Sequence, residues 1–105
     1  MAVINPAKFS WQAPTLNTDG SPVVGTLNYR LEVDGVAFLD FPGTLNPDGS
    51  YSEETANMGL PSGEHVVTLR AFYADQPDLI SDPSGALTIL VGVTAPQAPL
   101  AFSAE

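Results

Sequence analysis

Apolar and polar residues alternate with a period of two along much of this chain. The alternation or a short apolar run marks six segments: 8–12, 27–33, 36–41, 50–58, 64–73 and 85–93. A period of two is typical of β-strands with one buried face. Ten prolines and nine glycines are spread over the whole length, so no long window keeps the 3.6-residue period of a helix. The pattern therefore predicts about six strands and no long helix.

The segments between these strands contain turn-forming residues. "NTDGSP" (17–22) and "NPDGS" (46–50) each hold an Asp-Gly step, which tolerates the positive φ angles of tight turns. "VDGV" predicts a two-residue hairpin that joins Leu27–Val33 to Val36–Phe41. Short strands separated by such turns predict an all-β fold, an antiparallel two-sheet β-sandwich of about six to seven strands.

Length and composition fit one globular domain. The chain has 105 residues, of which 44% are hydrophobic, and this is enough for a single core. A compact chain of this length has a radius of gyration of about 13 Å. The chain has no cysteine, which excludes disulfides, thiolate metal sites and thiol chemistry.

The charge balance is strongly acidic. Twelve acidic residues face three basic ones, Lys8, Arg30 and Arg70, for a formal net charge of −9. Because phosphate neutralisation needs clustered bases, we expect no nucleic-acid binding, and the same shortage disfavours anionic membranes. No apolar run approaches the roughly 20 residues of a membrane span. The start, "MAVINPAKFSW", lacks the pattern of a signal peptide. We attribute the charge to solubility and mutual repulsion, with recognition of a basic partner as the alternative. We expect protein partners, copies of the chain included, and no membrane insertion.

Two longer stretches carry an ordered series of short motifs. The first runs from "SWQAP" through "NTDGSP" to "LNYRLEVDG", and the second is "LPSGEHVVTLRAFYADQPDLISDPSGALTILV". Together they resemble a fibronectin type III domain over residues 8–93. The matching positions are Trp11, Pro14, Tyr29, Leu60, Gly63, Val67, Leu69, Ala71, Pro83 and Ser84. The resemblance implies an immunoglobulin-like sandwich with Trp11 in the core and Tyr29 on the third strand.

The chain departs from that family in two places. His65 stands where the family has a Tyr whose hydroxyl bonds back to the backbone; an imidazole is able to replace that bond. Only seven residues precede "KFSW", too few for the family's first strand and its turn, whereas the tail "APQAPLAFSAE" resembles that strand. We divide the chain into a lead (1–7), a sandwich (8–93) and a Pro-containing tail (94–105). The tail is either a linker or a strand that docks on its own chain or on a neighbour.

Two groups of residues follow from this interpretation. The inward positions give the candidate structural core: Trp11, Tyr29, Leu31, Leu60, His65, Val67, Leu69 and Ile89. The apolar positions outside it give the candidate partner-docking residues: Phe38, Phe41, Phe72, Pro96, Pro99, Leu100 and Phe102. Phe38 and Phe41 belong to a strand that is apolar on both faces, and such a strand lies between two layers or faces a partner. Ordinary packing under a loop is the other explanation for these side chains and for Phe72.

Catalytic and metal-binding patterns are weak. His65 is the only histidine, it is predicted to point inward, and no Gly-x-Ser-x-Gly motif accompanies it. Four carboxylates lie in or near turns, where oxygen ligands suit a hard cation: Asp19, Asp48, Glu53 and Glu54. The spacing of an EF-hand fails, because Thr55 stands where its bidentate Glu would be. We expect no enzyme activity, no cofactor and no metal, with weak cation binding at the Asp-Gly turns as the alternative.

The resemblance also implies a setting for the protein. Compact immunoglobulin-like and fibronectin-like domains are common on bacteriophage heads and tails, as decoration, cement or adaptor proteins. An acidic domain that starts at Met without an export signal fits a virion, because virion proteins leave the cell by lysis. The alternative is a spacer or ligand-binding module of a secreted multidomain bacterial protein, which is extracellular.

Overall fold

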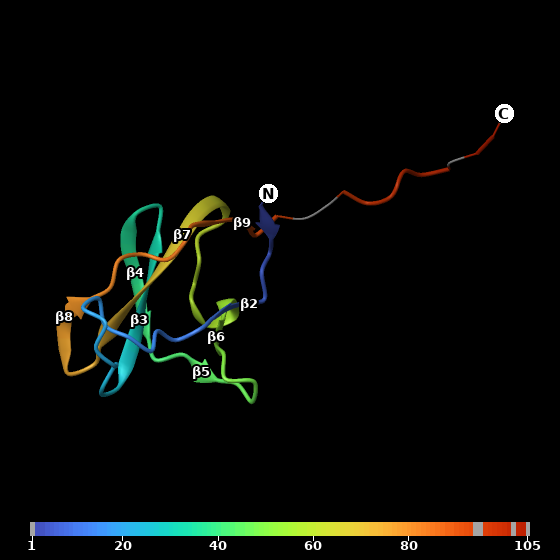
Figure 1. Cartoon of the computed structure of the whole chain (residues 1–105). Helices are drawn as coiled ribbons and strands as arrows, with labels where there is room; N and C mark the ends of the chain where they lie inside the picture. The colour runs from blue at the N-terminus through green and yellow to red at the C-terminus, as the bar shows by residue number, and fades with distance from the viewer. Residues whose placement is uncertain (1, 94–95, 102, 105) are drawn as a thin grey trace.

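The structure, a computed structural model, describes residues 2–93, 96–101 and 103–104, and they form an all-β fold of two sheets (Figure 1). A single 3-10 turn, η1 (Thr55–Asn57), accompanies the strands. The nine strands of the described residues are β1 (Val3–Ile4), β2 (Lys8–Trp11), β3 (Leu27–Val33), β4 (Val36–Phe41), β5 (Thr44–Leu45), β6 (Tyr51–Glu54), β7 (Gly63–Tyr73), β8 (Gln76–Ile80) and β9 (Leu87–Val91). The predicted all-β, two-sheet fold class is confirmed, and the larger strand number reflects the two-residue strands β1 and β5 and the five-residue strand β8.

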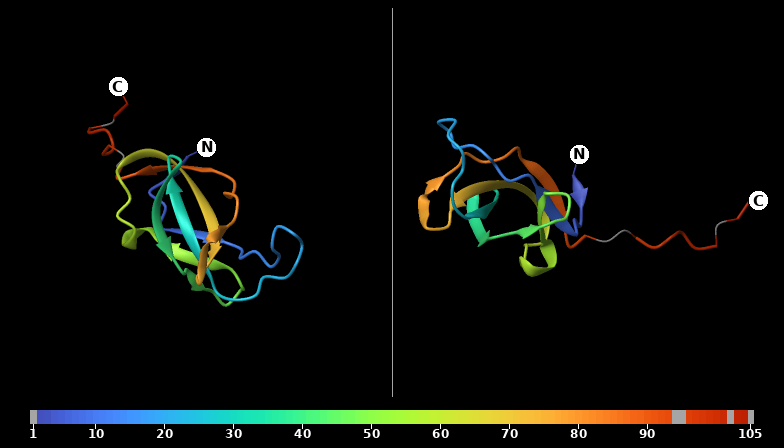
Figure 2. Two further views of the ribbon diagram at one scale, coloured as in Figure 1. Left: turned by 90° about the vertical axis from the view of Figure 1, so that its left-hand side faces the viewer. Right: turned by 60° about the horizontal axis from the view of Figure 1, so that its bottom comes forward.

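The larger sheet has the strand order β1-β9-β7-β3-β4, and β8 pairs with β7 beyond the end of β9. The smaller sheet has the order β2-β6-β5. All pairs are antiparallel except β1 with β9, which is parallel. The two sheets pack over one core, as the two turned views in Figure 2 show.

The β3–β4 hairpin has the bounds that the sequence predicts. Asp34 (φ 52°) and Gly35 (φ 82°) form its two-residue turn, and both have the positive φ that such a turn requires. The register places Val33 opposite Val36 at the turn and Tyr29 opposite Phe41 at the other end. Local turn chemistry therefore accounts for this element.

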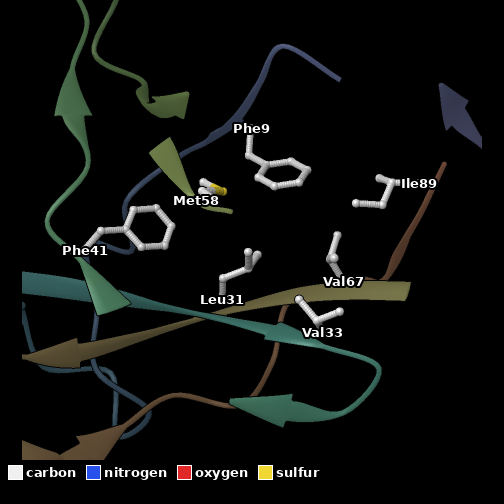
Figure 3. Packing of buried hydrophobic residues seen from close by; sticks show 7 residues of the cluster. All are labelled: Phe9, Leu31, Val33, Phe41, Met58, Val67 and Ile89. Carbon is white, nitrogen blue, oxygen red and sulfur yellow. The ribbon is translucent and has the colours of Figure 1, made fainter. Parts of the chain in front are cut away.

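The core lies between the two sheets. Seven buried side chains from both sheets and from the end of η1 point toward one another in Figure 3: Phe9, Leu31, Val33, Phe41, Met58, Val67 and Ile89. An aromatic cluster continues the core at one end. The Trp11 ring centroid lies 4.9 Å from that of Tyr29, 5.7 Å from that of Phe41 and 6.4 Å from that of Tyr51. Such offset and edge-on contacts add stabilisation beyond area burial.

The candidate core residues occupy three kinds of place. Four of them are buried to within 2% exposure: Tyr29, Leu31, Val67 and Ile89. Three are partly buried and pack against the core cluster: Trp11, Leu60 and Leu69. His65 differs, since its side chain is 17% exposed and bonded to polar partners at the margin of the core. The alternation along β7 predicts that His65 points inward. However, His65 lies near the start of β7, where its side chain contacts the polar turn of the β3–β4 hairpin instead of the core. Met58 is a core residue that strand periodicity does not reveal, because it follows a 3-10 turn.

The N-terminal lead belongs to the sheet, so the interpretation that a first strand is missing is wrong. Val3 and Ile4 pair with Ile89 and Leu90 at the edge of β9. The chain then turns toward β2 at Asn5, which has a φ of 44°. Asn tolerates a positive φ better than most residues. The seven residues before β2 are enough for this strand and its turn, because β1 pairs with β9 over only two residues.

The tail follows β9 and leads away from the sheets in Figure 1 and Figure 2. Its described residues, 96–101 and 103–104, are all exposed. The Cα radius of gyration is 18.0 Å and the longest extent is 71 Å, against 30 and 23 Å for the other two axes. The excess over the roughly 13 Å of a compact chain of this length comes from the tail.

Candidate interaction surfaces

One candidate surface is the outer edge of β4, a terminal strand of the larger sheet. Its pairing with β3 shifts between Leu31 and Glu32, because Phe38 is an extra residue that forms a β-bulge. Phe38 is 39% exposed, and Val36 at the start of the strand is 68% exposed. Exposed apolar side chains on a strand edge are typical of docking surfaces.

Two of the predicted docking residues are instead buried in the chain. Phe41 is 6% exposed, because it faces inward opposite Tyr29 and meets Trp11 edge-on. Phe72 is on the outer face of β7 but is only 4% exposed. The Arg30 guanidinium lies 5.2 Å from its ring centroid, a cation–π contact that covers one side of it. Both expectations of partner docking are therefore wrong.

A groove of about 440 Å³ lies beside Phe72, between the loop 12–26 and the β7–β8 hairpin. Both apolar and polar side chains from the loop and the hairpin line it, and two of the polar ones are the carboxylates Asp19 and Asp78. The Tyr73 hydroxyl donates a 2.6 Å hydrogen bond to Asn17 Oδ1 and holds the loop to the hairpin. Loop and hairpin thus form one surface, which strand periodicity does not predict.

Ion pairs occupy the outer face of the larger sheet. Arg30 donates two hydrogen bonds to Asp40, at 2.8 and 3.0 Å, and this guanidinium lowers the pKa of the Asp40 carboxyl. Arg70 Nε donates to Glu32 Oε1 at 2.9 Å and likewise lowers the pKa of Glu32. Both arginines of the chain are therefore neutralised within it.

The polar site around His65 connects the β3–β4 hairpin to β7. His65 Nδ1 lies 2.7 Å from Asp34 Oδ2, and His65 Nε2 lies 3.0 Å from the Ser62 carbonyl oxygen. The other Asp34 oxygen accepts a 2.9 Å hydrogen bond from the Val66 amide. The contact from Nε2 joins the ring to a backbone oxygen three residues earlier in the chain. Both ring nitrogens are engaged, and no hydroxyl or thiol nucleophile is bonded to either of them in the described part of the chain.

The two Asp-Gly turns repeat one hydrogen-bonded unit, Asn-x-Asp-Gly-Ser. In residues 17–21, the Ser21 amide and hydroxyl both donate to Asp19 Oδ1. In residues 46–50, the Ser50 amide and hydroxyl donate to Asp48 Oδ1 at 3.0 and 2.6 Å. These bonds lower the pKa of both carboxyls. Both aspartates are thus used within their own turns, and no cluster of three or more His, Cys, Asp or Glu suited to a metal occurs among the described residues.

A narrow cavity opens at the side of the sandwich where β2 faces the segment before β9. We call it the β2 slot. Its volume is about 220 Å³, and it is lined by Phe9, Ser10, Trp11, Leu31, Val67, Thr68, Leu69, Ser84, Gly85 and Leu87. Most of these side chains are apolar, and Leu87 at its rim is 51% exposed. The slot brings together residues of four strands (β2, β3, β7 and β9) and of the loop before β9, so the sequence pattern alone does not predict it.

The tail carries the remaining predicted docking residues. Pro96, Pro99 and Leu100 are exposed, and Leu100 reaches 89% exposure. Phe102 lies outside the described residues. The described apolar residues of the tail are thus exposed to solvent and pack against no other part of the chain that the structure describes.

Comparisons of the chain with protein-family models, with curated proteins and with solved structures found no match in any of the three. Within the described residues, no helix is long and apolar enough to cross a membrane.

Proposed function

We propose that this protein is a non-catalytic, fibronectin type III-like module that docks to a larger protein assembly, as a phage virion decoration, cement or adaptor protein. The observation that carries the proposal is the exposure of apolar side chains on both terminal strands of the larger sheet. Val3 and Ile4 on β1 are 49% and 62% exposed, and Val36 and Phe38 on β4 are 68% and 39% exposed. Monomers rarely leave apolar sheet edges open, because such edges pair with other chains.

The use of the polar groups supports a non-catalytic role. The lone histidine, both arginines and both turn aspartates are engaged in contacts that hold the fold together. The net charge of −9 supports a protein partner over a nucleic acid. The order β1-β9-β7-β3-β4 over β2-β6-β5 supports the immunoglobulin-like arrangement that the motif order implies.

The exposed, proline-containing tail favours a second candidate function, a spacer or ligand-binding module in a secreted multidomain bacterial protein. A tail of this composition is suited to link two domains. In that case the reading frame continues past Glu105 into a further domain.

Mass spectrometry of particles separated on a density gradient after lysis of the source cells tests the proposal. Co-migration of the chain with intact particles supports the virion role. Its recovery only in the soluble secreted fraction, as part of a longer polypeptide, would overturn the virion role in favour of the secreted module. The position of the reading frame among capsid and tail genes provides an independent check.

A further inference from the structure

We infer that the β2 slot receives the tail of a second copy of this chain, so that copies join head to tail. This inference rests on the proposed function, which it deepens by assigning the docking surface and the segment that fills it.

The β2 slot has an open strand edge beside it. β2 is a terminal strand of the smaller sheet, and its outer edge has no strand partner in the part of the chain that the structure describes. Core side chains Leu31, Val67 and Leu69 form part of the lining, so a group that enters the slot reaches the core. A cavity of roughly 150 Å³ accommodates a benzene molecule. The 220 Å³ of the β2 slot is therefore sufficient for a Leu or an aromatic side chain.

The tail has the chemistry to fill such a slot. Leu100 is 89% exposed, the highest exposure of any large apolar side chain in the described residues. Leu100 stands between a rigid residue, Pro99, and a small one, Ala101, and Phe102 follows Leu100 by two positions. Ala101 has a positive φ of 53° in the undocked tail, so docking requires this segment to become extended; residues two apart then share one face of the strand. An added strand offers backbone hydrogen bonds to β2 and inserts alternate side chains into the slot.

The occupant is a second copy because the chain's own tail leaves in another direction. Asn5 Nδ2 donates to the Val93 carbonyl at 2.7 Å, and the Gly92 amide donates to Asn5 Oδ1 at 2.9 Å. These bonds fasten the root of the tail to the lead, at the Val91 end of β9. The slot lies at the opposite end of β9, beside Leu87, and β1 covers the edge of β9 between them. A tail that docked on its own chain would have to reverse and pass over β1.

The contact is heterologous, since the tail and the slot are different surfaces. Heterologous contacts build rings or open chains rather than closed two-fold dimers. One short strand buries less than the roughly 1,200 Å² of a stable complex, so association is weak and depends on concentration. Within an assembly, where copies are held close together, a weak contact of this kind is sufficient.

Light scattering of the full chain over a wide concentration range, together with the emission of Trp11, tests the inference. Trp11 is the only tryptophan and lines the slot, so its spectrum reports on occupation. The weight-average mass of the unmodified chain should rise with concentration, without a plateau at two copies, while the Trp11 emission changes in parallel. Leu100→Asp in the tail and Leu87→Asp at the slot rim should each abolish both changes. Ser103→Asp in the tail and Leu45→Asp on β5 are the matched controls, and both should associate like the unmodified chain.

Each alternative result has a defined meaning. A full chain that stays monomeric at all concentrations overturns the inference, and so does association that survives both Leu100→Asp and Leu87→Asp. A Trp11 change that depends on Leu100 but not on concentration means that the tail docks on its own chain. Because the Leu87 variant could unfold, the addition of a peptide of residues 94–105 to the unmodified chain provides a second test, and it should return assemblies to monomers. All of these failures leave the proposed function standing if the chain still co-migrates with particles.

Discussion

His65 Nδ1 lies 2.7 Å from Asp34 Oδ2, and the opposite ring nitrogen lies 3.0 Å from the Ser62 carbonyl oxygen. Both facing atoms are acceptors, so the two contacts are hydrogen bonds at the same time only when the ring is protonated, because a neutral imidazole donates from one nitrogen alone. The Asp34 carboxylate, followed by the Ser62 carbonyl, accordingly raises the pKa of His65. The Val66 amide and the His65 ring together lower the pKa of Asp34. The pair connects a hairpin turn to β7 through charge.

The pH dependence of stability follows from the raised pKa of His65 and the lowered pKa of Asp34. The raised pKa of His65 contributes stability that is fully present below the ordinary value of about 6.5 and is lost as the pH rises through the folded pKa. The lowered pKa of Asp34 contributes stability that is present above about 3.9 and is lost in acid. Urea unfolding at several pH values should therefore give the largest contribution of this pair between about pH 4 and 6.5.

The single histidine makes the pKa directly measurable. The imidazole signal in a proton NMR titration should have its midpoint above the ordinary value of about 6.5, and Asp34→Asn should lower that midpoint. Asn tolerates the positive φ of position 34, so the hairpin turn is retained. A midpoint at or below the ordinary value in the unmodified chain would contradict the imidazolium assignment.

Gly43 is expected to be the glycine least tolerant of substitution. It has a φ of 73°, and an added Cβ would lie 2.7 Å from Trp11 Cζ2. Gly43→Ala should lower the free energy of unfolding by roughly 2–4 kcal/mol, because the strain of a left-handed Ala adds to the displacement of the indole. The control is Gly49→Ala, where φ is 89° and no atom lies within 4 Å of the added Cβ. It should cost only about 1–2 kcal/mol in urea unfolding. Equal losses at both positions would contradict the close packing of Trp11 against Gly43.

Ile89 is the residue whose truncation should most weaken the core. It is 1% exposed and lies in the cluster that both sheets share. Ile89→Ala should lower the free energy of unfolding by about 2–5 kcal/mol in chemical denaturation. Leu45→Ala, at a side chain that is 62% exposed, should change it by less than about 1 kcal/mol. A small loss at Ile89 would mean that the two sheets do not share this core.

Asn5 is expected to control local opening at the root of the tail. Asn5→Gly keeps the positive φ but removes the side chain that accepts from the Gly92 amide. The Gly92 amide should then exchange faster with deuterium, and the free energy of unfolding should fall by about 1 kcal/mol for the lost bonds. The Ser81 amide, which donates to the Ala71 carbonyl, serves as the internal reference and should exchange at an unchanged rate. Unchanged exchange at Gly92 would show that Asn5 does not hold this segment.

Salt should strengthen the association of copies. Each copy carries a formal charge of −9, so approaching copies repel one another until ions screen the charge. Light scattering at fixed protein concentration should give a larger mass in high salt than in low salt. A mass that falls with added salt would mean that ion pairs, rather than the apolar tail, join the copies.

The sequence predicted the elements that depend on local chemistry. The Asp34–Gly35 turn is encoded by the residues that form it, and alternation along 27–33 places Tyr29 and Leu31 inward. The errors concern long-range contacts. Phe41 is buried because the bulge at Phe38 shifts the alternation of inward and outward side chains along β4. Neither Phe38 nor Phe41 indicates by its residue type that a bulge forms there.

The candidate surfaces were less predictable for the same reason. Phe72 is covered by Arg30 from another strand, and β1 is a strand only because β9 lies beside it. His65 and Asp34 are 31 positions apart, so no local motif predicts their contact. The β2 slot exists only after two sheets and a loop have come together.

The three bases of the chain all lie inside hydrogen-bonded strands: Lys8 in β2, Arg30 in β3 and Arg70 in β7. A protease of trypsin-like specificity cleaves after Lys or Arg in an extended chain that has left its sheet, so it finds its sites only when these strands open. The rate of cleavage by such a protease is therefore expected to follow the equilibrium between folded and open forms. With only three such sites, all within strands, the chain is expected to resist proteases of this specificity for as long as its sheets stay closed.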